Sequence, residues 1–338
     1  MKKSAMMAAV AMATAIWFAP QTASAEVTEL KVPLGAGGFG FLPLHVMKTN
    51  KLVEKHAKEE GIELTVDWSN IGGPAAMNEA LLSGAASFIS AGPPSFLTLW
   101  DKTRTNLKVK GVAAMSTMPM FLNTADPDIK SLDDIKGDMK IGVTSVKVSI
   151  PSIIMQMYAR EKYGDDQTFR FDPFTVSMAH PDSVIALVTG NGSIVAHYAS
   201  QPFAQRELKE EAIHTIQNSD DVTGGPTTFT MISTTTKFHD ENPKAYAAFV
   251  GALKEAQEMI ANDREAALDV LIQSMGGKAV LDRDEMMAIL TSDDTKYTTV
   301  PSNVMKYATF MHDIGSLKNA PETLGDLFFE SDDVAGGN

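Results

Sequence analysis

The chain has 338 residues, with 29 basic and 42 acidic side chains and no cysteine. Because cysteine is absent, disulfides, thiolate metal sites, iron–sulfur clusters and cysteine nucleophiles are excluded. The formal net charge of −13 disfavours nucleic acid and anionic membrane surfaces as partners.

The N-terminus has the pattern of a secretory signal peptide. Lys2 and Lys3 precede an apolar run over 5–19, and small residues lead up to Ala25. Cleavage after Ala25 would leave a mature chain that begins at Glu26, outside the cytoplasm. The apolar run is shorter than the roughly 20 residues that a membrane span needs. We therefore expect a secreted, periplasmic protein without a membrane anchor.

Short strand-like runs alternate with longer helical runs from residue 29 to residue 115. Such alternation predicts right-handed βαβ units, and therefore an α/β fold with mostly parallel sheets and helices on both faces. The expected strands are 30–34, 62–68, 86–90 and 107–115, and the expected helices are 42–58, 75–82 and one that starts at Ser95.

A second series of elements begins where Pro119 and Pro127 break this alternation. Segment 218–226 is rich in Asp, Thr and Gly, which indicates a second crossing between lobes. Between the two breaks we expect a capped helix at 131–134, strands at 140–143, 169–176 and 193–197, and helices at 149–163 and 182–189. After the second break we expect a strand at 227–235 and helices at 243–260, 264–275 and 284–290.

Segment 35–40 matches the Gly-x-Gly-x-x-Gly pattern of dinucleotide-binding folds. Pro43 fits the first turn of a helix, so the helix begins after Gly40 and not within the glycines, as pyrophosphate binding would require. Asp67 follows Gly40 by 27 residues, which is later than the usual spacing of about 20. An exported protein also meets little free NAD. We interpret 35–40 as a loop whose backbone N–H groups face a cleft.

Two further loops with glycine, 69–74 and 91–95, also join a predicted strand to a predicted helix. The carboxyl ends of parallel strands lie at one edge of a sheet, and ligands bind at that edge in open α/β folds. Each loop leads into a helix N-terminus, whose unpaired N–H groups and positive dipole end attract anionic or strongly polar groups. Any one loop could be a simple tight turn, but the three together favour a ligand site.

The sequence indicates no catalytic or metal centre. No two of the seven histidines have the HxxxH or HxH spacing of a metal site, and neither G-x-S-x-G nor H-E-x-x-H occurs. We therefore predict a protein that is not an enzyme and has no cofactor or metal. His180 precedes a helix and His197 follows a strand, so both could face a cleft, although each also fits an ordinary structural role. Trp68 and Phe41 are core candidates that lie beside the proposed ligand loops.

Several stretches of the chain have an order and spacing typical of one family. They are Phe41-Leu42-Pro43-Leu44 with 51–54, Val66-Asp67-Trp68, 80–88, 131–137 before 141–143, 186–190 and Asn242-Pro243. With these stretches the chain resembles the periplasmic substrate-binding proteins of ABC importers in the nitrate/sulfonate/taurine group, which includes relatives that bind pyrimidine precursors of thiamine. Many relatives have Trp-x-Pro after the last strand of the second lobe, whereas this chain has HYASQPF over 197–203.

This resemblance implies a type II binding-protein fold, in which two α/β lobes are joined by two crossovers and close on a ligand. It implies a first lobe of 26–117 and 222–338, and a second lobe of 118–221. It also implies a receptor, usually a monomer, that captures a small polar molecule by hinge closure and delivers it to an ABC permease with its cytoplasmic ATPase.

A small organic anion is the expected ligand, for example a sulfonate, taurine, nitrate or a carboxylate, because helix N-termini and serines bind such groups without arginine. A neutral nitrogen heterocycle such as a pyrimidine, bound with His180 or His197 and Asp67, is the alternative. A pyrimidine-synthesis enzyme of the same fold and a ligand-sensing partner of a membrane receptor are further alternatives. The expected ligand-binding residues are Phe39, Gly40, Phe41, Trp68, Gly72, Gly73, Pro94 and Ser95 in the first lobe, and Ser145, Ser149, His180 and His197 in the second.

Overall fold

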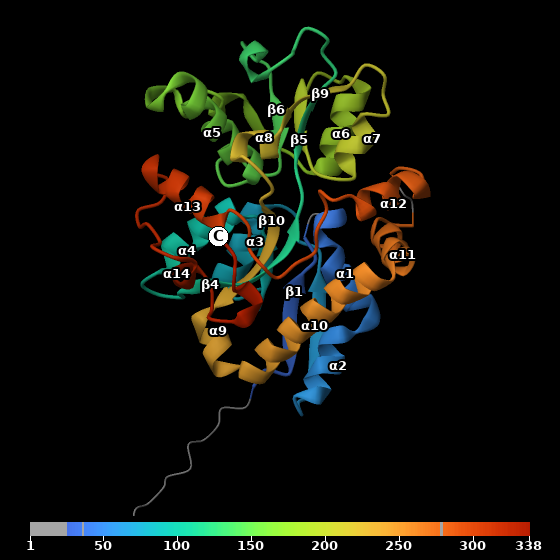
Figure 1. Cartoon of the computed structure of the whole chain (residues 1–338), viewed down its shortest axis with the longest axis vertical. Coiled ribbons are helices and arrows are strands. Elements are labelled where there is room, and N and C mark those ends of the chain that lie inside the picture. Colours follow the sequence, from blue (N-terminus) through green and yellow to red (C-terminus); the bar gives the residue numbers. More distant parts are fainter. Residues whose placement is uncertain (1–25, 36, 278–279) are drawn as a thin grey trace, which may run out of the picture.

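The computed structural model describes residues 26–35, 37–277 and 280–338. The predicted signal peptide and Ala36 of the first glycine loop lie outside the described residues. Figure 1 shows two α/β lobes stacked along the long axis of the molecule, with the green and yellow-green middle of the chain forming the upper, second lobe. Within the described ranges, no helix combines the length and apolar character needed to cross a membrane.

The first lobe is built on two small sheets that lie side by side. The Ser87 N–H donates a 2.8 Å hydrogen bond to the Lys31 carbonyl, which links the two sheets. In one sheet β1 (Glu29–Pro33) pairs in parallel with β2 (Thr65–Ser69); in the other β10 (Thr228–Thr235) lies antiparallel between β3 (Ile89–Ala91) and β4 (Val109–Thr117).

Helices cover both faces of the first-lobe sheets (Figure 1). The helix predicted over 42–58 is two helices, because Lys51 adopts a left-handed conformation with a φ of 50° and ends the first of them. The helices are η1 (Phe39–Phe41), α1 (Leu42–Asn50), α2 (Leu52–Glu59), α3 (Pro74–Leu82), α4 (Pro93–Thr103), α9 (Thr236–Glu241), α10 (Pro243–Asn262), α11 (Arg264–Ser274), α12 (Arg283–Thr291), α13 (Val304–Asp313), α14 (Leu324–Leu327) and η5 (Asp332–Val334).

The second lobe has one sheet of five strands in the order β7-β6-β8-β5-β9. The strands are β5 (Phe121–Thr124), β6 (Ile141–Val143), β7 (Thr175–Ser177), β8 (Ala196–Ala199) and β9 (His214–Asn218). The helices are η2 (Leu132–Asp134), α5 (Ile150–Tyr163), η3 (Asp165–Gln167), η4 (Asp172–Phe174), α6 (His180–Thr189), α7 (Phe203–Glu207) and α8 (Ser219–Thr223).

The predicted α/β fold class is confirmed, with one addition. Every antiparallel pairing among the described strands involves β5 or β10, which are the strands that follow the two crossings between the lobes. The other pairings, β1–β2, β6–β7 and β6–β8, are parallel as predicted. The strand expected over 169–176 is mostly 3-10 turns, and only its end enters β7.

The chain passes between the lobes at two places in the described residues. Met118, Pro119 and Met120 connect β4 to β5, and α8 with the residues after it connects β9 to β10. Met118 and Met120 are each only 2% exposed, so this first crossing is packed into the protein. A cavity lies next to it, where elements of both lobes meet.

Candidate ligand-binding site

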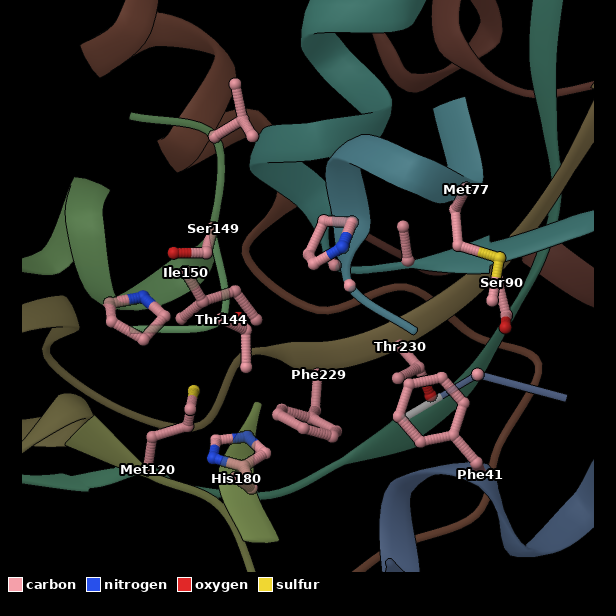
Figure 2. Close-up of a pocket in the computed structure, with 17 residues that line it drawn as sticks. Phe41, Met77, Ser90, Met120, Thr144, Ser149, Ile150, His180, Phe229 and Thr230 are labelled. Carbon is pink, nitrogen blue, oxygen red and sulfur yellow. The ribbon is translucent and has the colours of Figure 1, made fainter. Parts of the chain in front are cut away.

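A cavity lies between the two lobes. Figure 2 shows its walls, to which both lobes contribute. The first lobe supplies Gly35, Phe41, Gly73, Pro74, Met77, Ser90, Ala91, Gly92, Phe229 and Thr230; the rest of the lining is Met120, Thr144, Val148, Ser149, Ile150, Pro151 and His180.

Four helices begin at the wall of this cavity. Gly73 and Gly92 directly precede α3 and α4, Ser149 directly precedes α5, and His180 is the first residue of α6. The first N–H groups of a helix have no partner within the helix, and the helix dipole makes this end positive. Proline, which has no N–H, occupies the first position of α3, the first two of α4 and the second of α5 and α6, so the donors are the other N–H groups of each first turn. None of the described lining residues is Lys, Arg, Asp or Glu. The cavity therefore favours anionic or hydrogen-bond-accepting groups through backbone donors.

Glycine is required at two of these helix starts. Gly73 has a φ of 82°, a left-handed conformation that side chains rarely allow. A Cβ atom on Gly92 would lie 2.8 Å from the Ile150 Cδ1 atom and 3.1 Å from the Phe229 carbonyl oxygen. The small size of Gly92 thus lets the loop before α4 approach the start of α5, which belongs to the other lobe.

Much of the cavity wall is apolar. The rings of Phe41 and Phe229 meet edge to face, with centroids 6.4 Å apart and an angle of 74° between their planes. Met77, Met120 and Ile150 extend this surface, as Figure 2 shows. A ligand of this cavity would therefore bury an apolar body together with its polar groups.

Ser90 on β3 is a polar group in this wall that the protein leaves unsatisfied. Its side chain is only 1% exposed, and its Oγ has no hydrogen-bond partner among the described residues. Thr230, which lies nearby in the wall, is different because its Oγ1 donates to the Gly40 carbonyl at 2.7 Å. A buried hydroxyl without a partner costs about 1–3 kcal/mol, and a ligand that bonded to Ser90 would remove that cost.

His180 is the first of three buried side chains that are joined by hydrogen bonds. The His180 Nδ1 atom lies 2.9 Å from His197 Nε2, and His197 Nδ1 lies 2.5 Å from Glu207 Oε1. Asn123 Nδ2 donates to the other Glu207 oxygen at 2.9 Å. The ring of His180 also stacks on Phe203, with centroids 5.3 Å apart. We call His180, His197 and Glu207 the histidine chain.

Burial controls the ionisation of the histidine chain. Removal from water lowers the pKa of His180 well below 6.5 and lowers the pKa of His197 to about 3. The same effect raises the pKa of Glu207 from 4.5 to about 8, although the hydrogen bond from Asn123 opposes the rise. The chain therefore carries no net charge at neutral pH.

Residues 57–267 match the family model described as NMT1/THI5 like. The chain belongs to this family. No curated protein matches the sequence. The alkanesulfonate-binding protein SsuA from Xanthomonas axonopodis pv. citri, bound to MOPS, is 14% identical, with 88% of this chain and 96% of that chain covered and a TM-score of 0.67.

The nitrate-binding protein NrtA from Synechocystis PCC 6803 is also 14% identical, with 89% of this chain and 85% of that chain covered and a TM-score of 0.68. The aliphatic sulphonate binding protein SsuA from Escherichia coli is 15% identical, with 93% and 96% covered and a TM-score of 0.60. These likenesses show that the NMT1/THI5-like chain has the fold of periplasmic binding proteins. These three neighbours are binding proteins and not enzymes, in agreement with the expectation from the sequence.

Four of the residues predicted for the ligand site of this NMT1/THI5-like protein line the cavity: Phe41, Gly73, Ser149 and His180. Three others lie directly behind the wall. Ser95 Oγ donates to the Pro74 carbonyl at 3.2 Å, the Ser145 carbonyl accepts from Ser149 Oγ at 2.6 Å, and His197 belongs to the histidine chain. The remaining five, which do not line the cavity, are Phe39, Gly40, Trp68, Gly72 and Pro94.

Sequence reasoning did not find Ser90, Phe229 or Glu207. Ser90 directly precedes the predicted loop 91–95, so its place at a strand end was a usable signal. Phe229 lines the cavity only because β10 lies between β3 and β4, and this strand order cannot be inferred from the local sequence pattern. Glu207 resembles a surface residue in sequence, since it stands between Arg206 and Lys209 in a short polar segment.

Proposed function

We propose that this protein is an extracytoplasmic solute-binding receptor of an ABC uptake system, which captures a small organic anion between its lobes. One observation carries the proposal: four helix N-termini meet at a cavity whose described lining has no charged side chain. Backbone N–H groups at helix N-termini bind anions without the help of arginine or lysine. The names of the sulfonate- and nitrate-binding neighbours support the same class of ligand.

The proposed ligand has an anionic head and an apolar body. The Phe41 and Phe229 rings in the cavity wall offer contact area to a hydrocarbon or aromatic group, which nitrate does not have. No described lining residue offers a carboxylate to an ammonium group, so the cavity fits taurine less well than a simple sulfonate or carboxylate. In Figure 2, Ser90 and His180 lie on opposite sides of Phe229, so a ligand that met both would have polar groups at two ends.

We propose as ligand contacts the predicted residues that line the cavity, Phe41, Gly73, Ser149 and His180. Capture would use hinge closure of a first lobe, 26–117 and 222–338, over a second lobe, 118–221. The receptor would be exported to the periplasm by the signal peptide, act as a monomer and deliver its ligand to a membrane permease with a cytoplasmic ATPase.

A neutral nitrogen heterocycle such as a pyrimidine is the second candidate ligand. The aromatic rings of Phe41 and Phe229 favour it, since they could pack against a flat ring while His180 and Ser90 bond to its edges. Unlike an organic anion, a neutral heterocycle would make little use of the positive ends of four helices.

A thermal-shift screen distinguishes these ligands. The protein is unfolded and refolded to remove any carried ligand, then heated with benzenesulfonate, 4-hydroxybenzenesulfonate, benzoate, taurine, nitrate and cytosine. A ligand at 100 times its Kd adds about 2.7 kcal/mol to the free energy of unfolding, which raises the melting temperature visibly. The proposal expects shifts with the aromatic sulfonates or benzoate. A shift with cytosine alone would favour the second candidate, and no shift with any of them would contradict the assigned ligand class.

A further inference from the structure

The histidine chain reaches the cavity at one end and the interior of the second lobe at the other. His180 at the start of α6 lines the cavity, whereas His197 on β8 and Glu207 on α7 do not. His197 and Glu207 are each 0% exposed. Burial of such an ionisable pair is costly, because the polar groups are removed from water, whereas a hydrophobic pair in the same place would avoid this cost. The burial of His197 and Glu207 therefore suggests a functional role.

The outer end of the chain is fixed by neutral hydrogen bonds. Asn123 Nδ2 faces the Ala204 carbonyl at 3.2 Å, which can only accept, and its Oδ1 accepts from Thr215 Oγ1 at 2.7 Å. These contacts set the orientation of the Asn123 amide, so that Asn123 donates to Glu207 at 2.9 Å. The second Glu207 oxygen is then the one that faces His197.

The direction of the hydrogen bonds depends on a single proton. If Glu207 and His197 share one proton between them, His197 Nε2 donates to His180 Nδ1, whether that proton rests on the carboxyl or on the imidazole. A neutral His180 whose Nδ1 accepts must carry its own proton on Nε2. If the shared proton is lost, His197 donates to Glu207 and accepts from His180, and His180 Nε2 becomes an acceptor.

We propose that Glu207, acting through His197, fixes His180 as a hydrogen-bond donor to the ligand, so that the cavity selects groups that accept hydrogen bonds and binds anions with uptake of one proton at alkaline pH. His180 is the contact in this proposal, whereas His197 and Glu207 are positioning residues. The identity of the ligand in this proposal rests on the proposed function. The proton positions of the two histidines do not, because they can be measured in the ligand-free protein.

The surroundings of the chain support one shared proton at neutral pH. Burial raises the pKa of Glu207 to about 8 and lowers the pKa of both histidines. The charged group that acts on Glu207 from its own helix is Arg206, which lowers the pKa and forms an ion pair with Glu210 at 2.8 Å. On α6, Asp182 lies in the first turn after His180. His197 on β8 faces His180. Asn123 on β5 and Thr215 on β9, which face the histidine chain, are neutral.

The proton positions can be measured by two-bond 1H–15N NMR spectra of the whole protein labelled with 15N-histidine. At about pH 7 we expect His180 to carry its proton on Nε2, and above a midpoint near pH 8 we expect the proton on Nδ1. In Glu207→Gln the amide oxygen must face Asn123, so the amide nitrogen donates to His197 at every pH. His180 in this variant should therefore keep its proton on Nε2 up to about pH 10.

Calorimetric titration with benzenesulfonate tests the consequence for binding. In the unaltered protein the Kd should rise about tenfold per pH unit above the midpoint, because each ligand must then bring one proton with it. Glu207→Gln should bind as well as the unaltered protein at about pH 7 and should lose this pH dependence. The control is Glu210→Gln, which removes a half-exposed carboxylate three residues further along the chain and should keep it.

Two results would overturn the proposal. One is a His180 that carries its proton on Nδ1 at about pH 7, or whose tautomer does not change between about pH 6 and pH 10. The other is a pH dependence of benzenesulfonate binding that is equal in the unaltered protein and in Glu207→Gln. If benzenesulfonate does not bind at all, the proposed ligand class fails while the NMR result still decides the role of Glu207. The spectra of the unaltered protein also stand if Glu207→Gln does not fold.

Discussion

Substitution of Ser90 by alanine should change stability and affinity in opposite directions. The Ser90 hydroxyl is buried, and among the described residues it has no hydrogen-bond partner. A buried polar group without a partner costs about 1–3 kcal/mol. Ser90→Ala removes this cost and only one atom of packing, so we expect the free energy of unfolding of the ligand-free protein to rise by about 1 kcal/mol.

Urea unfolding of the ligand-free protein measures the first effect. Ser183→Ala is the matched control, because Ser183 is also fully buried, its Oγ also lacks a partner among the described residues, and it does not line the cavity. Both variants should be more stable than the unaltered protein. Only Ser90→Ala should change ligand binding.

The second effect needs a pair of ligands. One net hydrogen bond contributes about 0.5–1.5 kcal/mol, so 4-hydroxybenzenesulfonate should bind up to about tenfold more tightly than benzenesulfonate if its hydroxyl meets Ser90. In Ser90→Ala this advantage should vanish, while in Ser183→Ala it should persist. A destabilised Ser90→Ala with an unchanged ratio of the two dissociation constants would refute the reasoning.

Three further predictions concern pH, the aromatic wall and a residue outside the cavity. On folding, the pKa of Glu207 rises from 4.5 to about 8, that of His197 falls from 6.5 to about 3, and that of His180 falls well below 6.5. Up to about pH 6.5 the unfolded chain binds more protons at the two histidines than it loses at Glu207, so the stability should rise with pH; from about pH 6.5 to pH 8 only Glu207 differs, so the stability should fall, and in urea unfolding Glu207→Gln should lack this fall. Phe229→Leu should weaken benzenesulfonate binding about two- to tenfold, because an aromatic pair contributes about 0.5–1.5 kcal/mol beyond buried area; unchanged calorimetric affinity would exclude stacking on this ring. Trp68→Phe should leave that affinity unchanged, because Trp68 does not line the cavity, and a tenfold loss would place the ligand elsewhere.

Helix starts could be predicted because their signals are local. Proline in a first turn and glycine directly before it mark the starts of α3 and α4, and both begin within two residues of the predicted positions. These are the features that bring backbone donors to the cavity. The sequence therefore predicted the helix starts that line the cavity, and binding of a ligand at these loops stays a prediction.

The strands of the crossings could not be predicted in the same way. Strands β5 and β9 have four and five residues, and their pairing joins segments about ninety residues apart in the chain. Likewise, β10 was expected as a strand, but its antiparallel place between β3 and β4 depends on the whole first lobe. Phe229 and Thr230 reach the cavity only through that pairing.

The histidine chain shows the same limit within the site. His180 and His197 were both singled out, because the sequence placed one before a helix and the other after a strand; in the structure His180 is the first residue of α6 and His197 lies within β8. Glu207 was not, because its burial arises from packing of α7 against β5 and β8 and leaves no trace in the polar segment around it. A sequence pattern can thus indicate a site residue such as His180 without indicating the buried group, here Glu207, that we propose sets its protonation.

The position of a bound anion tests the central claim most directly. We would determine the crystal structure of the refolded protein with benzenesulfonate. The account predicts that the sulfonate lies against the N-termini of the helices that begin at the cavity, within hydrogen-bond distance of His180 Nε2, and that the ring lies against Phe229. A sulfonate bound outside this cavity, or bound in it with its charge held by a lysine or arginine side chain, would contradict the account.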